Sequence, residues 1–213
     1  MKSSLIRPAL ALALAAGLAG CGGSDKAEFT VKGTVTGIAY PGMVLTTNGM
    51  EIAVAPPAKA GDPVSFAFPN KLEYGDVYDV QIKAFPAHQK ECGTPPNTIP
   101  NFTDTAGRLA EINVTIACDI DRYTIGGTIT GLTGAGLVLA NGSTGGQLAV
   151  TLPTTPTTTP LTYSLPPVFY GQTYSLAIIK QPTGQVCTVT NPTGTMGDAK
   201  VENINITCVA APS

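Results

Sequence analysis

The amino-acid sequence contains an internal duplication, and this feature constrains the fold more than any other. FTVKGTVTGIAYPGMVL at 29–45 aligns with YTIGGTITGLTGAGLVL at 123–139, and eight of the seventeen positions are identical. Three later features follow in the same order in both copies: the turns YGDVY at 74–78 and YGQTY at 170–174, the cysteines Cys92 and Cys187, and the segments INVTIAC at 112–118 and INITC at 204–208. Because copies of this length each bury a core of their own, we expect two tandem domains, at residues 29–119 and 122–210.

Within each copy, apolar and polar residues alternate with a period of two. In the first copy Val31, Gly33 and Val35 alternate with threonine and lysine, which is typical of a strand with one face on a core and the other in water. Further strand-like runs lie at 43–46, 50–54, 64–68 and 77–84, with counterparts near 137–140, 147–151, 162–165 and 173–180. Only 12% of the 213 residues are charged, while 24 are glycine and 18 proline. The sequence therefore predicts an all-β protein of antiparallel β-sandwiches, with no helix.

Two elements resemble a known group of folds. The opening strand with Gly33-Thr34-Val35-Thr36-Gly37, and the turn from Leu72 to Tyr78 that leads into a long strand, are similar to the prealbumin-like and immunoglobulin-like modules repeated in bacterial surface proteins. This resemblance covers nearly all of the chain after its N-terminal segment. It implies two tandem sandwich domains of that kind.

The N-terminus has the pattern of a secretion signal. A basic start precedes an apolar stretch from Pro8 to Leu18, which is shorter than the about 20 residues that a spanning helix needs. The residues Leu18-Ala19-Gly20-Cys21 resemble the lipobox of bacterial lipoproteins. This resemblance implies that residues 1–20 are a signal peptide, that Cys21 carries acyl chains such as palmitate, and that residues 21–28 are a tether.

The residue after Cys21 bears on which membrane holds the anchor. In lipoproteins of two-membrane bacteria an aspartate there tends to retain the protein at the inner membrane, whereas this chain has Gly22. The resemblance therefore implies a protein anchored by lipid to the bacterial outer membrane, facing the periplasm or the cell surface. More than one acyl chain makes such anchoring stable, so the membrane is an expected partner without a spanning helix.

The other four of the five cysteines fall into two matched pairs. Cys118 and Cys208 share the inward phase of the last strand in each copy, and Cys92 and Cys187 each follow a proline-containing loop. We expect disulfides between Cys92 and Cys118 and between Cys187 and Cys208, which join each last strand to the preceding turn. A zinc site or a redox pair is the alternative, but no closely spaced cysteine pair exists and His88 is the single histidine.

Four tyrosines stand at corresponding turn-to-strand corners: Tyr74, Tyr78, Tyr170 and Tyr174. Such tyrosines more often pack in the core with the hydroxyl bonded to backbone. Exposed aromatic rings that stack on sugars are the alternative.

The linker between the two copies is short and acidic. Asp119 and Asp121 lie in the linker, and we expect them to be solvated charges; calcium binding is the alternative, since hard cations take several oxygen ligands.

The loop from Gly93 to Gly107 is longer than its counterpart from Thr188 to Gly197. Loops that differ between duplicated domains are where binding specificity can diverge.

Charge and motif content exclude several classes of function. The net charge is −2 and no basic cluster exists, which argues against nucleic acid as a partner. The sequence has no lipase-type serine motif, P-loop or zinc-protease motif, so we expect no catalytic residues, cofactor or metal. The resulting hypothesis is a non-catalytic, lipid-anchored cell-envelope protein that binds or supports a cell-envelope protein or a glycan. A carbohydrate-binding module is the first alternative, and an enzyme of unrecognised type is the second.

Overall fold

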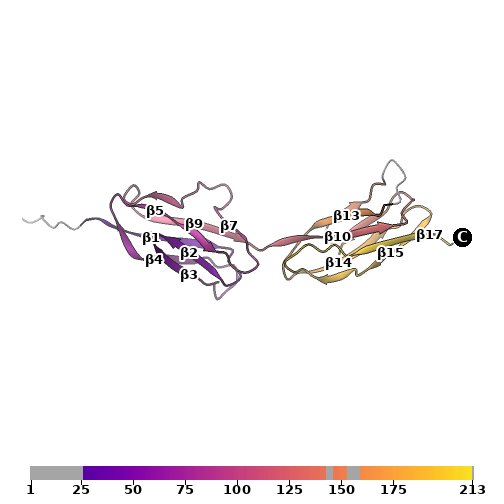
Figure 1. Ribbon diagram of the computed structural model, residues 1–213, viewed down its shortest axis with the longest axis horizontal. Helices are drawn as coiled ribbons and strands as arrows, with labels where there is room; N and C mark the ends of the chain where they lie inside the picture. The colour runs from indigo at the N-terminus through magenta and orange to yellow at the C-terminus, as the bar shows by residue number, and fades with distance from the viewer. Residues whose placement is uncertain (1–25, 143–145, 153–158, 213) are drawn as a thin grey trace, which may run out of the picture.

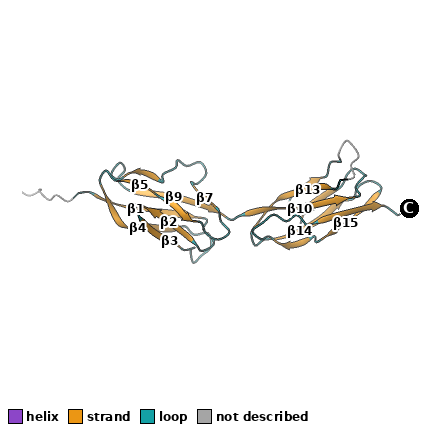
Figure 2. Ribbon diagram, in the orientation of Figure 1, coloured by secondary structure: helices purple, strands orange, loops and turns teal. Residues whose placement is uncertain are grey.

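A computed structural model describes residues 26–142, 146–152 and 159–212 of the chain. Within these residues every regular element is a β-strand (Figure 2), so the all-β prediction is confirmed. The strands form two groups that follow one another along the longest axis of the molecule (Figure 1). We refer to residues 26–119 as the N-terminal half and to residues 120–212 as the C-terminal half.

A strand lies at each of the predicted runs, and the runs at 64–68 and 162–165 are parts of longer strands. In the N-terminal half they are β1 (Glu28–Thr36), β2 (Met43–Thr47), β3 (Met50–Val54), β4 (Val64–Glu73), β5 (Val77–Asp79), β6 (Gln81–Ala84), β7 (Glu91–Gly93), β8 (Thr103–Thr105) and β9 (Ile112–Asp119). In the C-terminal half they are β10 (Arg122–Thr130), β11 (Val138–Asn141), β12 (Gln147–Ala149), β13 (Leu161–Phe169), β14 (Thr173–Lys180), β15 (Gln185–Thr190), β16 (Thr193–Thr195) and β17 (Asn205–Ala210).

Both halves have the same strand order. One sheet has the order β4-β1-β9-β7, and the C-terminal half repeats it as β13-β10-β17-β15. The strands β3-β2-β6 with the pair β5-β8 correspond to the sheet β12-β11-β14-β16. The first and last strands of each half, β1 with β9 and β10 with β17, run parallel, so the expectation of purely antiparallel sheets was wrong for these two pairs, whereas the other strand pairs are antiparallel. The sequence duplication is therefore also a duplication of strand topology.

Each half has its own cluster of buried apolar side chains. In the N-terminal half Val31, Leu45 and Ile116 come from three strands of two sheets, and all three are fully buried. The predicted alternation is clear in β9, where the side chains at 112, 114, 116 and 118 are buried and that of Asn113 is exposed. Burial of apolar surface between two sheets is the physical basis of a β-sandwich, and the described strands are consistent with one in each half.

Four short strands were not expected from the sequence: β7, β8, β15 and β16. They pair only at sheet edges, where one neighbouring strand rather than two supplies the hydrogen bonds. The predicted run at 77–84 is also divided, because β5 pairs with β8 while β6 pairs with β2. Its counterpart at 173–180 is the continuous strand β14.

Tyr163 makes the free energy of unfolding of the C-terminal half vary with pH in the alkaline range. Its hydroxyl donates to the backbone oxygen of Ile204 at 2.7 Å, and burial raises the pKa of Tyr163 from 10.0 to about 12. Because the folded-state pKa lies above the unfolded one, the stabilisation is complete below about pH 10 and is lost as the pH rises toward about 12. We expect Tyr163→Phe to cost about 1 kcal/mol at neutral pH and to flatten the pH profile above pH 10 in urea unfolding followed by circular dichroism.

The exposed Tyr74 provides the control, since Tyr74→Phe removes a hydroxyl from a side chain that is 71% exposed. That variant should keep the alkaline loss of stability. A Tyr163→Phe variant that loses stability between pH 10 and 12 as steeply as the unmodified protein would contradict this assignment.

Candidate functional site: an open sandwich edge in the N-terminal half

Two disulfides join the last strand of each half to an edge strand. Cys92 bonds to Cys118 and Cys187 to Cys208, and the two cysteines of each pair lie directly opposite in antiparallel register. These are the pairings that the sequence predicts. The prediction that each last strand is joined to a turn was wrong, because Cys92 and Cys187 lie within strands β7 and β15.

The predicted lipid-anchor segment lies outside the described residues. This applies to the signal peptide at 1–20, to Cys21 and to residues 21–25 of the tether. Lys26 and Ala27 precede β1, which begins at Glu28.

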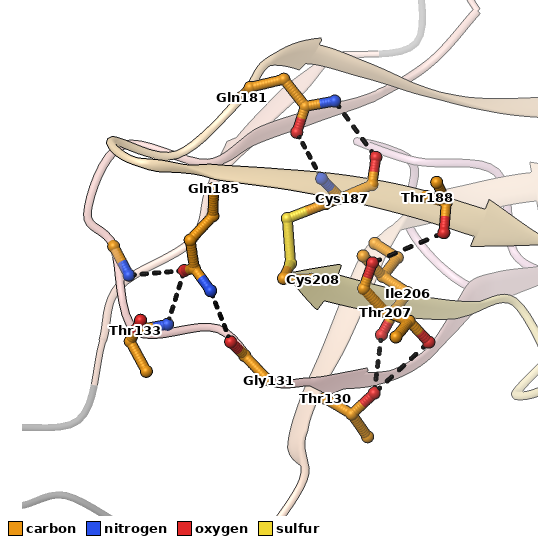
Figure 3. The surroundings of a disulfide bond; sticks show 11 residues. Thr130, Gly131, Thr133, Gln181, Gln185, Cys187, Thr188, Ile206, Thr207 and Cys208 are labelled. Atoms are coloured by element: carbon orange, nitrogen blue, oxygen red, sulfur yellow. Dashed lines mark hydrogen bonds between the residues drawn. A yellow bond between two sulfur atoms is a disulfide. The ribbon is translucent and has the colours of Figure 1, made fainter. Parts of the chain in front are cut away.

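Two glutamines that sequence reasoning missed hold the loop after the first strand of each half. Gln89 is fully buried, and its side-chain amide binds backbone groups of Gly37, Ala39 and Tyr40. Gln185 makes the equivalent bonds to Gly131, Thr133 and Gly134, as Figure 3 shows beside the disulfide. A glutamine two or three residues before the first cysteine of each pair is the sequence signal that could have found them.

A third glutamine closes one edge of the C-terminal half. Gln181 directly follows β14, and its side-chain amide both accepts from the backbone N–H of Cys187 at 2.8 Å and donates to the Cys187 carbonyl at 3.1 Å (Figure 3). Since β14 and β15 belong to different sheets, this amide bridges the two layers at their open side.

The N-terminal half has Phe85 at the position of Gln181. Ala84 pairs with Val44 as Lys180 pairs with Val138, so the next residues along the chain correspond. A phenyl ring has no hydrogen-bonding group, and Phe85 is 45% exposed. The layers of the N-terminal half therefore have no amide bridge at this point.

The neighbouring edge strand is also shorter in the N-terminal half. Strand β7 has three residues and β15 has six, because the longer loop leaves the sheet after Gly93. Part of the uncovered edge of β9 is bound by Asn101 of this loop, whose amide donates to the Asn113 carbonyl at 2.6 Å and accepts from the Thr115 N–H at 3.2 Å. The loop is thus bound to β9 at Asn101.

A groove of about 500 Å³ opens at this edge, and its lining is mainly apolar. The core residues Val80 and Ile116, which are 3% and 0% exposed, are among the residues that line it. The other lining residues are Ile82, Phe85, Pro100, Phe102, Asp79, Gln81 and Thr103. The groove therefore lies along β6, the last strand in the order β3-β2-β6.

Asp79 is the charged residue among those that line the groove. Its carboxylate accepts a hydrogen bond from the Thr103 hydroxyl and another from the Gln81 amide, each at 2.6 Å. The bond from Thr103 and, to a smaller extent, the bond from Gln81 hold the pKa of Asp79 below its ordinary value. The groove consequently has a carboxylate that favours its charged form beside apolar lining residues.

Comparison with known proteins gives no match. No family model, no curated protein and no solved structure matches the chain.

The described residues contain no group of histidine, cysteine and acidic side chains that could hold a metal ion. In the same part of the chain no helix is long and apolar enough to cross a membrane.

The four corner tyrosines do not behave alike. Tyr78 is buried, as expected, whereas Tyr74 is 71% exposed and the core prediction for it was wrong. Its ring lies over Gly107, where an added Cβ would come within 2.2 Å of the ring, so this ring covers a loop instead of filling the core. Tyr170 and Tyr174 are partly buried, and none of the four lines the groove.

Tyr170 instead lies at the contact between the two halves. Its ring stacks on His88 with centroids 3.6 Å apart and planes 8° apart, and Tyr40 meets both rings edge-on. The His88 Nδ1 atom lies 2.6 Å from an Asp198 carboxylate oxygen. Side chains from both halves therefore form one contact across the linker.

Asp121 of the linker is buried, so the expectation of two solvated linker charges was wrong for this residue. Its side chain is 7% exposed, and one carboxylate oxygen accepts from the backbone N–H of Lys90 at 2.8 Å. Its own N–H donates to the His88 carbonyl, and its carbonyl accepts from the Tyr170 N–H. Asp121 fixes backbone on both sides of the junction, which explains its burial without a calcium ion.

Proposed function

We propose that this protein is a non-catalytic, lipid-anchored protein of the bacterial outer membrane that serves as a binding module of the cell envelope. In this proposal its two halves are tandem domains of the immunoglobulin-like or prealbumin-like kind, and Cys21 carries the anchor. The groove along β6 carries the binding part of the proposal. It is found at a place where the duplicated halves differ, at Phe85 and the longer loop, and such differing loops commonly carry function on a shared scaffold.

The residues that line the groove support binding over catalysis. Asp79 stands there without a second carboxylate or a histidine, and the rest of the lining is apolar or neutral. A general acid–base pair or an activated nucleophile needs a partner group within hydrogen-bonding reach. A mainly apolar groove with a few placed polar groups is typical of a ligand-binding site.

Metabolic labelling with an alkyne fatty acid tests the anchor. The full chain expressed in a two-membrane bacterium should incorporate the label and fractionate with the outer membrane, because acyl chains at Cys21 hold it there. Cys21→Ala should abolish labelling, while Cys92→Ala should retain it. An unlabelled protein recovered in the soluble periplasm would overturn the anchor.

Protease treatment of intact and of permeabilised cells then determines which side of the membrane the protein faces. Cleavage on intact cells would place the groove at the cell surface and favour adhesion. Protection until permeabilisation would place it in the periplasm and favour an envelope partner.

Carbohydrate binding is the second candidate function, and Phe85 is the observation that favours it. Its exposed ring stands in the same groove as the Asp79 carboxylate and the Gln81 amide, and an aromatic face beside polar groups suits a sugar. A glycan array probed with the full chain in detergent tests this candidate. Binding that Phe85→Ala abolishes would support it, and an array without bound glycans would count against it.

A further inference from the structure

We propose that the groove takes an extended peptide, which adds to the free edge of β6 as a further strand and places a basic side chain next to Asp79. This inference rests on the proposed function as a binding module, and it names the class of partner.

The free edge of β6 is the first observation that carries it. Strand β8 pairs with β5 in register from Val77 to Asp79, and the Val80 N–H still donates to the Phe102 carbonyl at 2.8 Å. Before Phe102 the loop turns toward β9, where Asn101 is bound. No described strand pairs with the outer edge of β6 from Gln81 to Ala84. A peptide in line with β8 would continue the ladder that β8 has begun.

The C-terminal half supplies an internal comparison for this edge. There the Leu176 N–H donates to the Pro192 carbonyl, as Val80 does to Phe102. Beyond that point Gln181 bonds to the backbone of Cys187 in the opposite sheet and bridges the two layers (Figure 3). The outer edge of β14 from Ala177 to Lys180 also has no strand partner, so the two halves differ at this edge in the amide bridge, because Phe85 replaces Gln181 in the N-terminal half and the groove opens there.

The groove also suits the side chains of an added strand. Alternate side chains of a strand point to one face, and those that point inward would contact Ile82, Phe102 and the exposed ring of Phe85. Asp79, with its lowered pKa, gives one end of the groove a negative charge. A lysine or arginine in the peptide is the complementary residue. A glycan lacks the regularly spaced backbone groups that a free strand edge can pair with.

The test uses an array of peptides of about eight residues, enough to span β6, with β-branched residues at alternate positions and one lysine or one glutamate. The full chain in detergent micelles is the binding protein. We expect lysine peptides to bind better than glutamate peptides. Each selected peptide is then made in two forms, N-methylated on one or on the other set of alternate residues. One set should lose binding and the other retain it, because only one set donates to β6.

Matched variants locate the binding site. Phe85→Gln introduces the side chain that closes the C-terminal half, and it should weaken peptide binding by at least about tenfold. Phe169→Gln makes the same change at a phenylalanine of equal exposure, 46% against 45%, outside the groove, and should leave the affinity unchanged. Asp79→Asn should remove the preference for lysine. Circular dichroism melting of each variant verifies that it is folded.

Three outcomes would overturn the peptide inference: equal loss of binding in both N-methylated forms, equal effects of Phe85→Gln and Phe169→Gln, or an array with no bound peptide. Glycan binding that depends on Phe85 would overturn it in favour of the carbohydrate candidate while leaving a binding module. Fatty-acid labelling is independent of the groove, so failure of the anchor and failure of the peptide inference can be distinguished.

Discussion

Gly33→Val is expected to unfold the N-terminal half. A Cβ atom at Gly33 would lie 2.1 Å from the backbone oxygen of Val114 and 2.6 Å from the ring of Phe66. Val114 lies on β9, the parallel neighbour of β1, so the two central strands of the sheet would have to separate. Because a backbone oxygen cannot move aside as a flexible side chain can, we expect a loss of more than about 3 kcal/mol in the free energy of unfolding.

Hydrogen exchange read by mass spectrometry resolves this effect by segment. Peptides from β1, β4 and β9 should lose protection, while those from β10 and β17 should retain it, because each half has a separate core. Gly93→Ala is the matched control, since no atom lies within 4 Å of a Cβ there and its φ is ordinary. A folded Gly33→Val protein with normal protection in β1 would show that the strands approach less closely than described.

The second large effect is expected from loss of the C-terminal disulfide. Cys187 and Cys208 are 21 residues apart and lie opposite each other on β15 and β17. Closing a loop of this length stabilises a fold by about 3 kcal/mol in the chain-entropy model. Replacing both cysteines by alanine should lower the free energy of urea unfolding of the C-terminal half by about that amount, with a small addition from the space left in the core.

Reduction provides the control for this variant. Dithiothreitol should destabilise the C-terminal half of the unmodified protein and leave that of the double alanine variant unchanged, since only the former has a bond to break there. An unchanged unfolding midpoint in the double variant would mean that the β15–β17 ladder alone holds this edge.

The fold could be inferred from the sequence to a large extent because its signals are local and repeated. The alternation around Val31 and Ile116 predicts which face of a strand is buried, since side chains alternate across a sheet. The inward phase of Cys118 and Cys208 led to the pairings that the structure contains. Duplication strengthened each of these inferences, because a pattern found twice in the same order is seldom accidental.

The candidate site was predicted only in outline. The loop from Gly93 to Gly107 was singled out because its length differs from that of its counterpart, and it provides Pro100 and Phe102 of the groove. The importance of Phe85 was missed. It depends on the correspondence with Gln181, which only the strand register reveals.

The burial of Asp121 and the exposure of Tyr74 were both predicted wrongly from the sequence. A carboxylate in a short linker is ordinarily solvated, yet Asp121 is buried because folding brings the backbone N–H of Lys90, 31 residues away, to its carboxylate. A tyrosine at a repeated corner is ordinarily buried, yet Tyr74 covers Gly107 on the surface. In both cases partners distant in sequence determine the environment of the side chain.

The sequence by itself determined the all-β class, the repeated succession of strand-like runs and the cysteine pairs, because strand periodicity is a property of neighbouring residues and a duplication is visible in the order of residues along the chain. Only the tertiary structure decided what the differences between the two copies do at the edge of each sandwich. One edge is bridged by Gln181 and the other is open at Phe85, because this depends on which backbone groups of the opposite sheet come within hydrogen-bonding distance, and that distance is fixed only when both sheets have packed.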